Sequence, residues 1–213
     1  MADINLGVGA ANSATGGYEI DNSLKLEADN SENLYRDLNA SNEAVLLRFS
    51  NESGYEHGLQ IDIGGSSTNA RSVTTRKFRD TSAWYHFVLA VDTTQSTAAN
   101  RRRLYVNGVE ETVFGMSNLP SQNFAMEVSS AKHRYGAYND TDNYAPFSGY
   151  IAECHYVDGS QLDASSFGEF DDDSGIWKPK QYTGSYGTGG YYLDFSNSSA
   201  LGNNSAGDGT DFT

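Results

Sequence analysis

The sequence predicts an all-β protein, folded as a two-sheet antiparallel jelly-roll sandwich with a flexible N-terminal arm. Apolar segments recur at roughly 8–12-residue spacing between Gly, Ser, Asn and Asp clusters, as in sandwiches and barrels. The segment from Trp84 to Asp92 is apolar on both faces, as expected of a strand between two layers. Residues 103–109 alternate and include Asn107-Gly108, a strong hairpin signal.

Length and composition are sufficient for one domain with its own core. The chain has 213 residues, of which 38% are hydrophobic, and all-β sandwiches of this size commonly form a single domain. Its 14 Tyr and 10 Phe favour strands over helices. The glycine-rich start predicts a flexible arm over residues 1–17, which leaves 18–213 as the jelly-roll domain.

Candidate strands follow one another through the chain, and the clearest alternation lies at Val45–Phe49 and Leu59–Ile63. Asp163–Phe167 is the only helix-like stretch, a single turn at most. The expected strands cover Tyr18–Leu26, Ala44–Phe49, Gly58–Ile63, Ser72–Phe78, Trp84–Asp92, Arg103–Val109, Glu111–Phe114, Ala125–Ser129, His133–Ala137, Phe147–Val157 and Gly190–Phe195.

The charge pattern excludes some partners. A formal net charge of −14 argues against binding to nucleic acid and disfavours an anionic membrane. The local exception, Arg101-Arg102-Arg103, is interpreted as a soluble loop edge. No apolar run approaches transmembrane length, and the first residues lack the pattern of a secretory signal. We therefore expect a protein made in the cytoplasm, without membrane insertion.

Cysteine and histidine positions predict structural rather than catalytic or metal-binding roles. Cys154 is the only cysteine, and its alternation with Tyr156 predicts a buried structural thiol. The histidines show no metal-ligand spacing. His86 and His155 lie beside aromatic residues in expected strands, so we expect hydrogen-bonded core or interface side chains there.

Three segments resemble the laminin-G-like, concanavalin-A-like jelly-roll family. Trp84–Val88 is similar to its tryptophan-led strand, and Leu104–Gly108 to its following hairpin strand. Phe147–Glu153 is similar to a late strand of the family. The resemblance implies the jelly-roll fold, whereas the functions of the family are diverse.

A second resemblance covers residues 158–195. This segment is similar to a C-terminal extension, or tail, that follows such jelly-roll domains in proteins of marine and cyanobacterial phages. Its motifs are Ser166–Phe170, Gly175–Lys180 and Tyr191–Phe195. The resemblance implies a virion structural protein, assembled in the host cytoplasm and exposed on the particle. It also implies other virion subunits as partners and a homo-oligomeric state. Both fibre or host attachment and capsid decoration fit this expectation.

The chain departs from these relatives near Asn42. They carry another Trp-rich strand between the counterparts of Asn39 and Val45, whereas this chain runs almost directly from Asn42 to Val45. A shortened sheet is therefore expected, with an edge that a neighbouring subunit would cover.

The acidic run from Glu169 to Asp173 has three interpretations. It superficially resembles the alternating carboxylates of jelly-roll glucanases, which need two carboxyl groups on one strand face. Because the run leads into Ser174-Gly175, a solvated acidic turn is favoured over a catalytic pair. Calcium is a possible cofactor, since it prefers hard oxygen ligands from loops. The candidate calcium ligands are Asp171, Asp172 and Asp173, and separately Asp140 and Asp142.

Exposed aromatic side chains beside Asn and Asp are the candidate carbohydrate contacts, because rings stack on sugars while polar groups bind hydroxyls. Ordinary loop packing or a protein interface, where Tyr is also enriched, is the favoured explanation of such residues. The candidate residues are Tyr138, Asn139, Asp140, Asp142, Asn143 and Tyr144 in one loop, and Tyr182 and Tyr186 in another.

The functional expectation is a non-enzymatic virion structural protein. One alternative is a lectin-like module that binds host surface polysaccharide through the tyrosine-rich loops. The other is a polysaccharide depolymerase that uses Glu169 and Asp171.

Overall fold

The computed structural model describes residues 4–5, 18–27, 33–36, 45–64, 70–126, 133–137, 147–206 and 211–213. In these residues the protein is all-β, as predicted: short strands are joined by turns and by the short 3₁₀ helices η2 (Ala98–Arg101) and η4 (Ala164–Ser166), without an α-helix. Helix η4 confirms the single turn expected at 163–167. Neither helix has the length and apolar character needed to cross a membrane.

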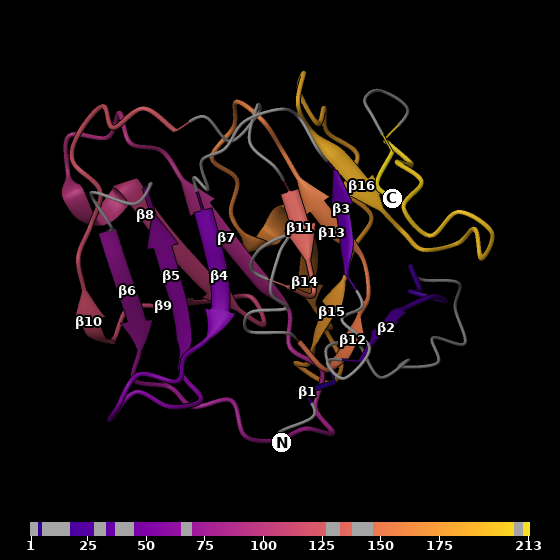
Figure 1. The fold of residues 1–213 in the computed structure, drawn as a ribbon, viewed down its shortest axis with the longest axis horizontal. Coiled ribbons are helices and arrows are strands. Elements are labelled where there is room, and N and C mark those ends of the chain that lie inside the picture. Colours follow the sequence, from indigo (N-terminus) through magenta and orange to yellow (C-terminus); the bar gives the residue numbers. More distant parts are fainter. Residues whose placement is uncertain are drawn as a thin grey trace.

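The central part of the chain forms two antiparallel sheets (Figure 1). One has the strand order β10-β6-β5-β4 and the other the order β7-β8-β9. Strand β4 is an edge strand of its sheet. The shortened edge predicted near Asn42 lies outside the described residues. The strand bounds are β4 Val45–Phe49, β5 Leu59–Ile63, β6 Ala70–Thr74, β7 Phe87–Val91, β8 Arg102–Val106, β9 Val109–Glu111 and β10 Phe114–Ser117.

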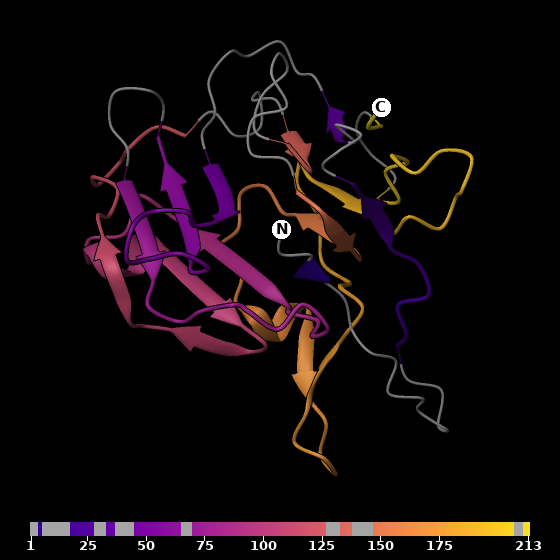
Figure 2. The ribbon, with the colours of Figure 1, turned by 60° about the horizontal axis from the view of Figure 1, so that its bottom comes forward.

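These two sheets meet across a buried cluster that we call the first core (Figure 2). On β5 every second residue is apolar, so one face of the strand points into the cluster, and β8 supplies side chains from the opposite sheet. Tyr85, Phe87 and Leu89 pack against its margin. The first core consists of Leu59, Ile61, Ile63, Phe78, Leu104 and Val106.

The β8–β9 hairpin turns at Asn107-Gly108, as predicted, and both residues have positive φ angles of 48° and 80°. The strand expected from Trp84, however, begins at Phe87. The reason is the turn itself: the Asn107 side chain accepts the His86 N–H at 2.8 Å, and the Asn107 N–H donates to the His86 carbonyl at 2.9 Å. The ladder with β8 therefore starts at Phe87, which pairs with Val106.

The expected soluble edge at Arg101–Arg103 is wrong for Arg102, which is buried with its guanidinium 3.8 Å from the centre of the Phe114 ring. Arg101 donates to three backbone carbonyls, and Arg103 pairs with Glu110. All three arginines therefore have contacts within the chain.

The remaining strands come from both ends of the sequence. Strand β2 (Leu24–Leu26) pairs with β12 (Gly149–Ile151), and β3 (Leu34–Arg36) pairs with β11 (His133–Tyr135). Strand β13 (Cys154–Tyr156) pairs with β16 (Tyr191–Leu193). The buried cluster between them is the second core: Leu24, Leu26, Leu34, Cys154, Tyr191, Leu193, Phe195 and Phe212.

The single strand expected over 147–157 is divided into β12 and β13. Glu153 has a φ of 53°, a left-handed conformation that interrupts an extended strand. Consequently β12 pairs with β2, whereas β13 pairs with β16. From the expected arm, Ile4–Asn5 forms β1 and pairs in parallel with β12, and the rest of 1–17 lies outside the described residues.

A hairpin of β14 (Gly168–Phe170) and β15 (Trp177–Pro179) projects from the body of the molecule (Figure 2). Its base packs on the outer face of the β7–β8 sheet, away from the first core. There Ala164 and Trp177 contact a small cluster with Val88, Ala90 and Tyr105. Both faces of β7 are therefore packed, as its apolar sequence predicts.

Candidate functional site

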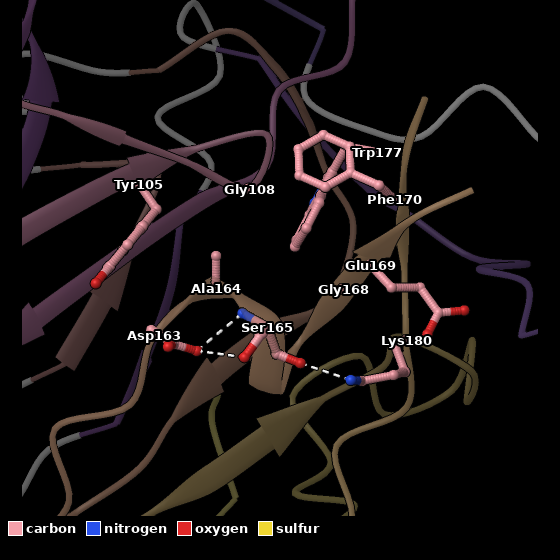
Figure 3. A pocket seen from close by; sticks show the side chains of 10 residues that line it. All are labelled: Tyr105, Gly108, Asp163, Ala164, Ser165, Gly168, Glu169, Phe170, Trp177 and Lys180. Atoms are coloured by element: carbon pink, nitrogen blue, oxygen red, sulfur yellow. Dashed lines mark hydrogen bonds between the residues drawn. The ribbon is translucent and has the colours of Figure 1, made fainter. Parts of the chain in front are cut away.

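An open hollow of about 350 Å³ lies beside η4, the β8–β9 turn and the β14–β15 hairpin (Figure 3). Its size is at the lower end of the range, roughly 300–1,000 Å³, of small-molecule sites. The lining comprises the aromatic residues Tyr105, Phe170 and Trp177, the polar residues Asp163, Ser165, Glu169 and Lys180, and the small residues Gly108, Ala164 and Gly168.

Two glycines make room for the Trp177 indole at the edge of this hollow. A Cβ atom on Gly108 would lie 2.2 Å from Cε3 of Trp177, and one on Gly168 would lie 2.4 Å from Cζ2. Both distances are too short for any larger residue without displacement of the ring. Gly108 therefore serves the tight turn and the close approach of Trp177 at the same time.

A hydrogen bond to His86 orients the indole. Trp177 Nε1–H donates to His86 Nδ1 at 3.1 Å. Burial lowers the pKa of His86 to about 4, and the nearby His155 acts in the same direction. His86 is therefore neutral at pH 7, which keeps Nδ1 available as an acceptor.

The polar rim is fixed by local hydrogen bonds. Asp163 Oδ1 accepts the Ser165 N–H at 3.0 Å and the Ser165 hydroxyl at 2.6 Å, which caps η4. Lys180 Nζ donates to the Ser165 carbonyl at 2.6 Å. Glu169 also lines the hollow (Figure 3), and Lys178 Nζ is 3.5 Å from its Oε1. Two carboxylates and one ammonium group thus line the hollow.

The acidic run divides between strand and turn. Glu169 and Phe170 belong to β14, so the expectation of a loop is wrong for them, because Glu169 pairs with Lys178 in the ladder. Asp171 starts the turn, and its Oδ1 accepts the N–H and the hydroxyl of Ser174, both at 2.9 Å. These bonds, followed by Lys178, lower the pKa of Asp171 to about 2.

This arrangement bears on the catalytic and calcium interpretations of the run. Lys178 Nζ contacts both Glu169 and Asp171, at 3.5 and 3.3 Å, and its bond to Asp171 helps to lower the pKa of that carboxyl group, whereas a general acid needs a raised pKa. In the part of the chain that the structure describes, no group of three or more His, Cys, Asp and Glu side chains is arranged to hold a metal ion. Calcium binding by Asp171, Asp172 and Asp173 stays a prediction.

A hydrogen-bonded network surrounds Glu153. The hydroxyls of Tyr18 and Tyr192 both bind Glu153 Oε1, and His155 Nε2 lies 3.8 Å from Oε2. Burial raises the pKa of this carboxyl, but the bonds from His155, Tyr18 and Tyr192 outweigh it, so the net shift is downward. His155 Nδ1 also bonds the Tyr186 hydroxyl at 2.8 Å. The network links Tyr18, near the start of the chain, to strands β13 and β16.

The predicted carbohydrate residues divide into two groups. The loop residues 138–144 lie outside the described residues, so their role stays a prediction. Tyr182 packs against Phe167 at 5.0 Å and against Tyr186 at 5.1 Å between ring centres. Both tyrosines are half-buried, and both hydroxyls are hydrogen-bonded within the chain.

The predicted burial of Cys154 and the predicted hydrogen bonds of two histidines are confirmed. Cys154 is buried, and burial raises the pKa of its thiol to about 12. His86 and His155 are half-buried, and each is hydrogen-bonded to an aromatic side chain.

The fold and the hollow define the class: a β-rich protein of several small sheets with an open, aromatic-walled site on the outer face of one sheet. Comparisons with protein-family models, with curated proteins and with solved structures find no match. The resemblance to laminin-G-like jelly rolls, and that of residues 158–195 to a segment that follows such jelly rolls in phage proteins, therefore stay predictions.

Proposed function

We propose that this chain is a non-catalytic jelly-roll component of a phage particle surface, and that it binds its partner at the β14–β15 hairpin. The observation that carries the proposal is apolar exposure at the projecting hairpin. Phe170 is 49% exposed and Ile176 is 66% exposed. Adjacent apolar side chains beside a hollow are typical of interaction sites.

Two further features support this assignment. The hairpin lies inside the 158–195 segment that resembles tails of phage virion proteins. The two sheets that meet across the first core suit a jelly-roll sandwich. Fibre attachment and capsid decoration both fit a surface of this kind.

Binding is favoured over catalysis because of Lys178. A glycosidase would need one carboxyl group that holds a proton near neutral pH. Here Lys178 contacts both Glu169 and Asp171, and the pKa of Asp171 is lowered. The lectin-like alternative depends on the loop at 138–144.

The test is the presence of the protein on particles and its dependence on the hairpin. Immunogold labelling and mass spectrometry of purified phage should detect the wild type. The double variant Phe170→Ala/Ile176→Ala should keep the fold but lose most particle occupancy. Val113→Ala, at another exposed apolar position, is the matched control and should retain it. A strictly monomeric protein that is absent from particles would contradict the proposal.

A further inference from the structure

The aromatic part of the hollow is suited to a cation. Phe170 and Trp177 meet edge to face, with ring centres 5.0 Å apart and planes at 72°. Phe170 is half exposed, so part of its ring is open to a ligand. The faces of aromatic rings attract ammonium and guanidinium groups, with Trp the strongest partner.

The polar part of the hollow has the complementary charge. Asp163 and Glu169 are both exposed, and one oxygen of each is engaged: Asp163 Oδ1 by Ser165 and Glu169 Oε1 by Lys178. The second oxygen of each carboxylate is the one a ligand would use. Lys180 is the one cation of the lining, and its ammonium group donates to the Ser165 carbonyl. The lining therefore carries a net negative charge.

The same combination of ring and carboxylate already holds an arginine nearby. Arg103 lies with Cζ 5.5 Å from the centre of the Tyr105 ring. Its Nε and Nη2 donate to the two carboxylate oxygens of Glu110, at 2.9 and 2.6 Å. This contact is made within the chain, on the sheet that forms one wall of the hollow. The hollow offers the same chemistry with exposed groups.

We infer that the hollow receives a cationic side chain, preferably an arginine guanidinium, from a neighbouring protein subunit. This inference rests on the proposed function, because it specifies the chemistry of that partner. A guanidinium group stacks on aromatic rings and binds carboxylates through a planar fork, which suits it better than an ammonium group. Arginine is also enriched at protein interfaces. The formal charge of −14 favours approach of a basic surface.

The chain supplies its own spectroscopic probe for this contact. It has two tryptophans, Trp84 and Trp177, so the nitrogen-15 NMR spectrum contains two indole N–H signals. Trp177 lines the hollow, whereas Trp84 contacts Tyr150 elsewhere. N-acetyl-arginine amide should shift the Trp177 signal saturably and leave Trp84 unchanged. N-acetyl-citrulline amide, a neutral analogue of similar shape, should shift neither signal.

Single substitutions test whether the shift of the Trp177 signal arises from binding in the hollow. Phe170→Ala and Glu169→Gln should each weaken the response to N-acetyl-arginine amide about two- to five-fold, the range for one exposed cation–π contact or ion pair. Asp172→Asn is the matched control, because it removes the same charge from an exposed residue of the hairpin outside the lining. It should leave the response nearly unchanged.

Several results would overturn the inference. They are an equal response to citrulline amide, no response to arginine amide, and an equal loss in Asp172→Asn and Glu169→Gln. A Trp177 shift with methyl glycosides instead of arginine amide would identify a carbohydrate site. Loss of particle occupancy in Phe170→Ala/Ile176→Ala without any arginine response would keep the proposed function and reject this inference alone.

Discussion

The two cores of this protein are stabilised in different ways. The first core contains only aliphatic side chains and a phenyl ring, so its packing is non-directional. In the second core the Tyr191 hydroxyl bonds His133 Nδ1 at 3.0 Å and the Tyr135 hydroxyl at 2.9 Å. The Arg36 guanidinium lies 4.7 Å from the Tyr191 ring centre and donates to the Gly189 carbonyl at 2.9 Å.

Strand length explains the difference. Strands β4 to β8 have five residues each, whereas the strands that surround the second core have three. A three-residue ladder supplies few backbone hydrogen bonds. Side-chain hydrogen bonds are then needed to fix the relative positions of these short strand pairs. The following predictions test this contrast between the cores and the site beside them.

The largest effect is expected from a cavity in the first core. Leu104 is 0% exposed, and Leu104→Ala should lower the free energy of unfolding by about 2–5 kcal/mol. Urea denaturation measures the loss. The matched control is Leu47→Ala on β4, because Leu47 is 39% exposed; its effect should be much smaller. Equal losses would show that the first core is not a separate packed unit.

A pH effect of similar size is expected at His86. The pKa of His86 is about 4 in the folded protein, whereas its ordinary value, which applies in the unfolded chain, is 6.5. Between these pH values the unfolded chain therefore binds more protons than the folded protein. The contribution of neutral His86 to the free energy of unfolding is fully present above pH 6.5 and decreases as the pH drops toward 4. The loss should reach about 3 kcal/mol.

Urea titrations across this range measure the pH effect, with His86→Gln as the comparison. The variant should show a flatter dependence, whereas His57→Asn, at an exposed position, should follow the wild type. Parallel curves for the wild type and His86→Gln would contradict the assignment of the effect to His86.

The contact between Gly108 and Trp177 has a matched control in Gly54. Both glycines have similar φ angles, 80° and 83°, but a Cβ on Gly54 meets nothing within 4 Å. Backbone strain should therefore be common to both alanine variants. Gly108→Ala should lose about 1–3 kcal/mol more, because it also displaces the indole. Equal stabilities, or an unchanged Trp177 N–H signal, would rule out the close approach.

The smallest effect concerns one tyrosine hydroxyl in the second core and one beside the first core. Tyr191→Phe leaves the ring in place but removes hydrogen bonds to His133 and Tyr135, at a loss of about 1 kcal/mol. Tyr85→Phe changes a ring that packs against the first core, where no hydrogen bond of its hydroxyl is formed within the described residues. It should be nearly neutral. Equal effects would remove the contrast between the cores.

The first core could be predicted from the sequence because its strands alternate. The alternation of apolar and polar residues in Leu59-Gln60-Ile61-Asp62-Ile63 predicts which face of the strand is buried, and the pair Asn107-Gly108 predicts the hairpin turn. Strand β3 was not predicted, because Leu34-Tyr35-Arg36 contains a buried arginine that looks like a surface residue. Strands β14 and β15 were missed because three aspartates between them resemble a loop.

The hollow could be predicted only in pieces. The sequence predicts a turn at Asn107-Gly108 and a helical turn that starts at Asp163. It also contains Gly175–Lys180, one of the motifs of the second resemblance. What assembles them is the close approach of Trp177 to Gly108 and its bond to His86. These contacts join residues far apart in the chain, so local periodicity contains no signal for them.

The strand pairing of the chain ends has a consequence for synthesis on the ribosome. Strands β2 and β3 pair with β12 and β11, and the Tyr18 hydroxyl bonds to Glu153. Strands β2 and β3 are therefore synthesised well before β12 and β11, with which they pair. Residues 45–126, in contrast, contain both sheets of the first core. Folding would then proceed from the middle outward, and the two ends would close last.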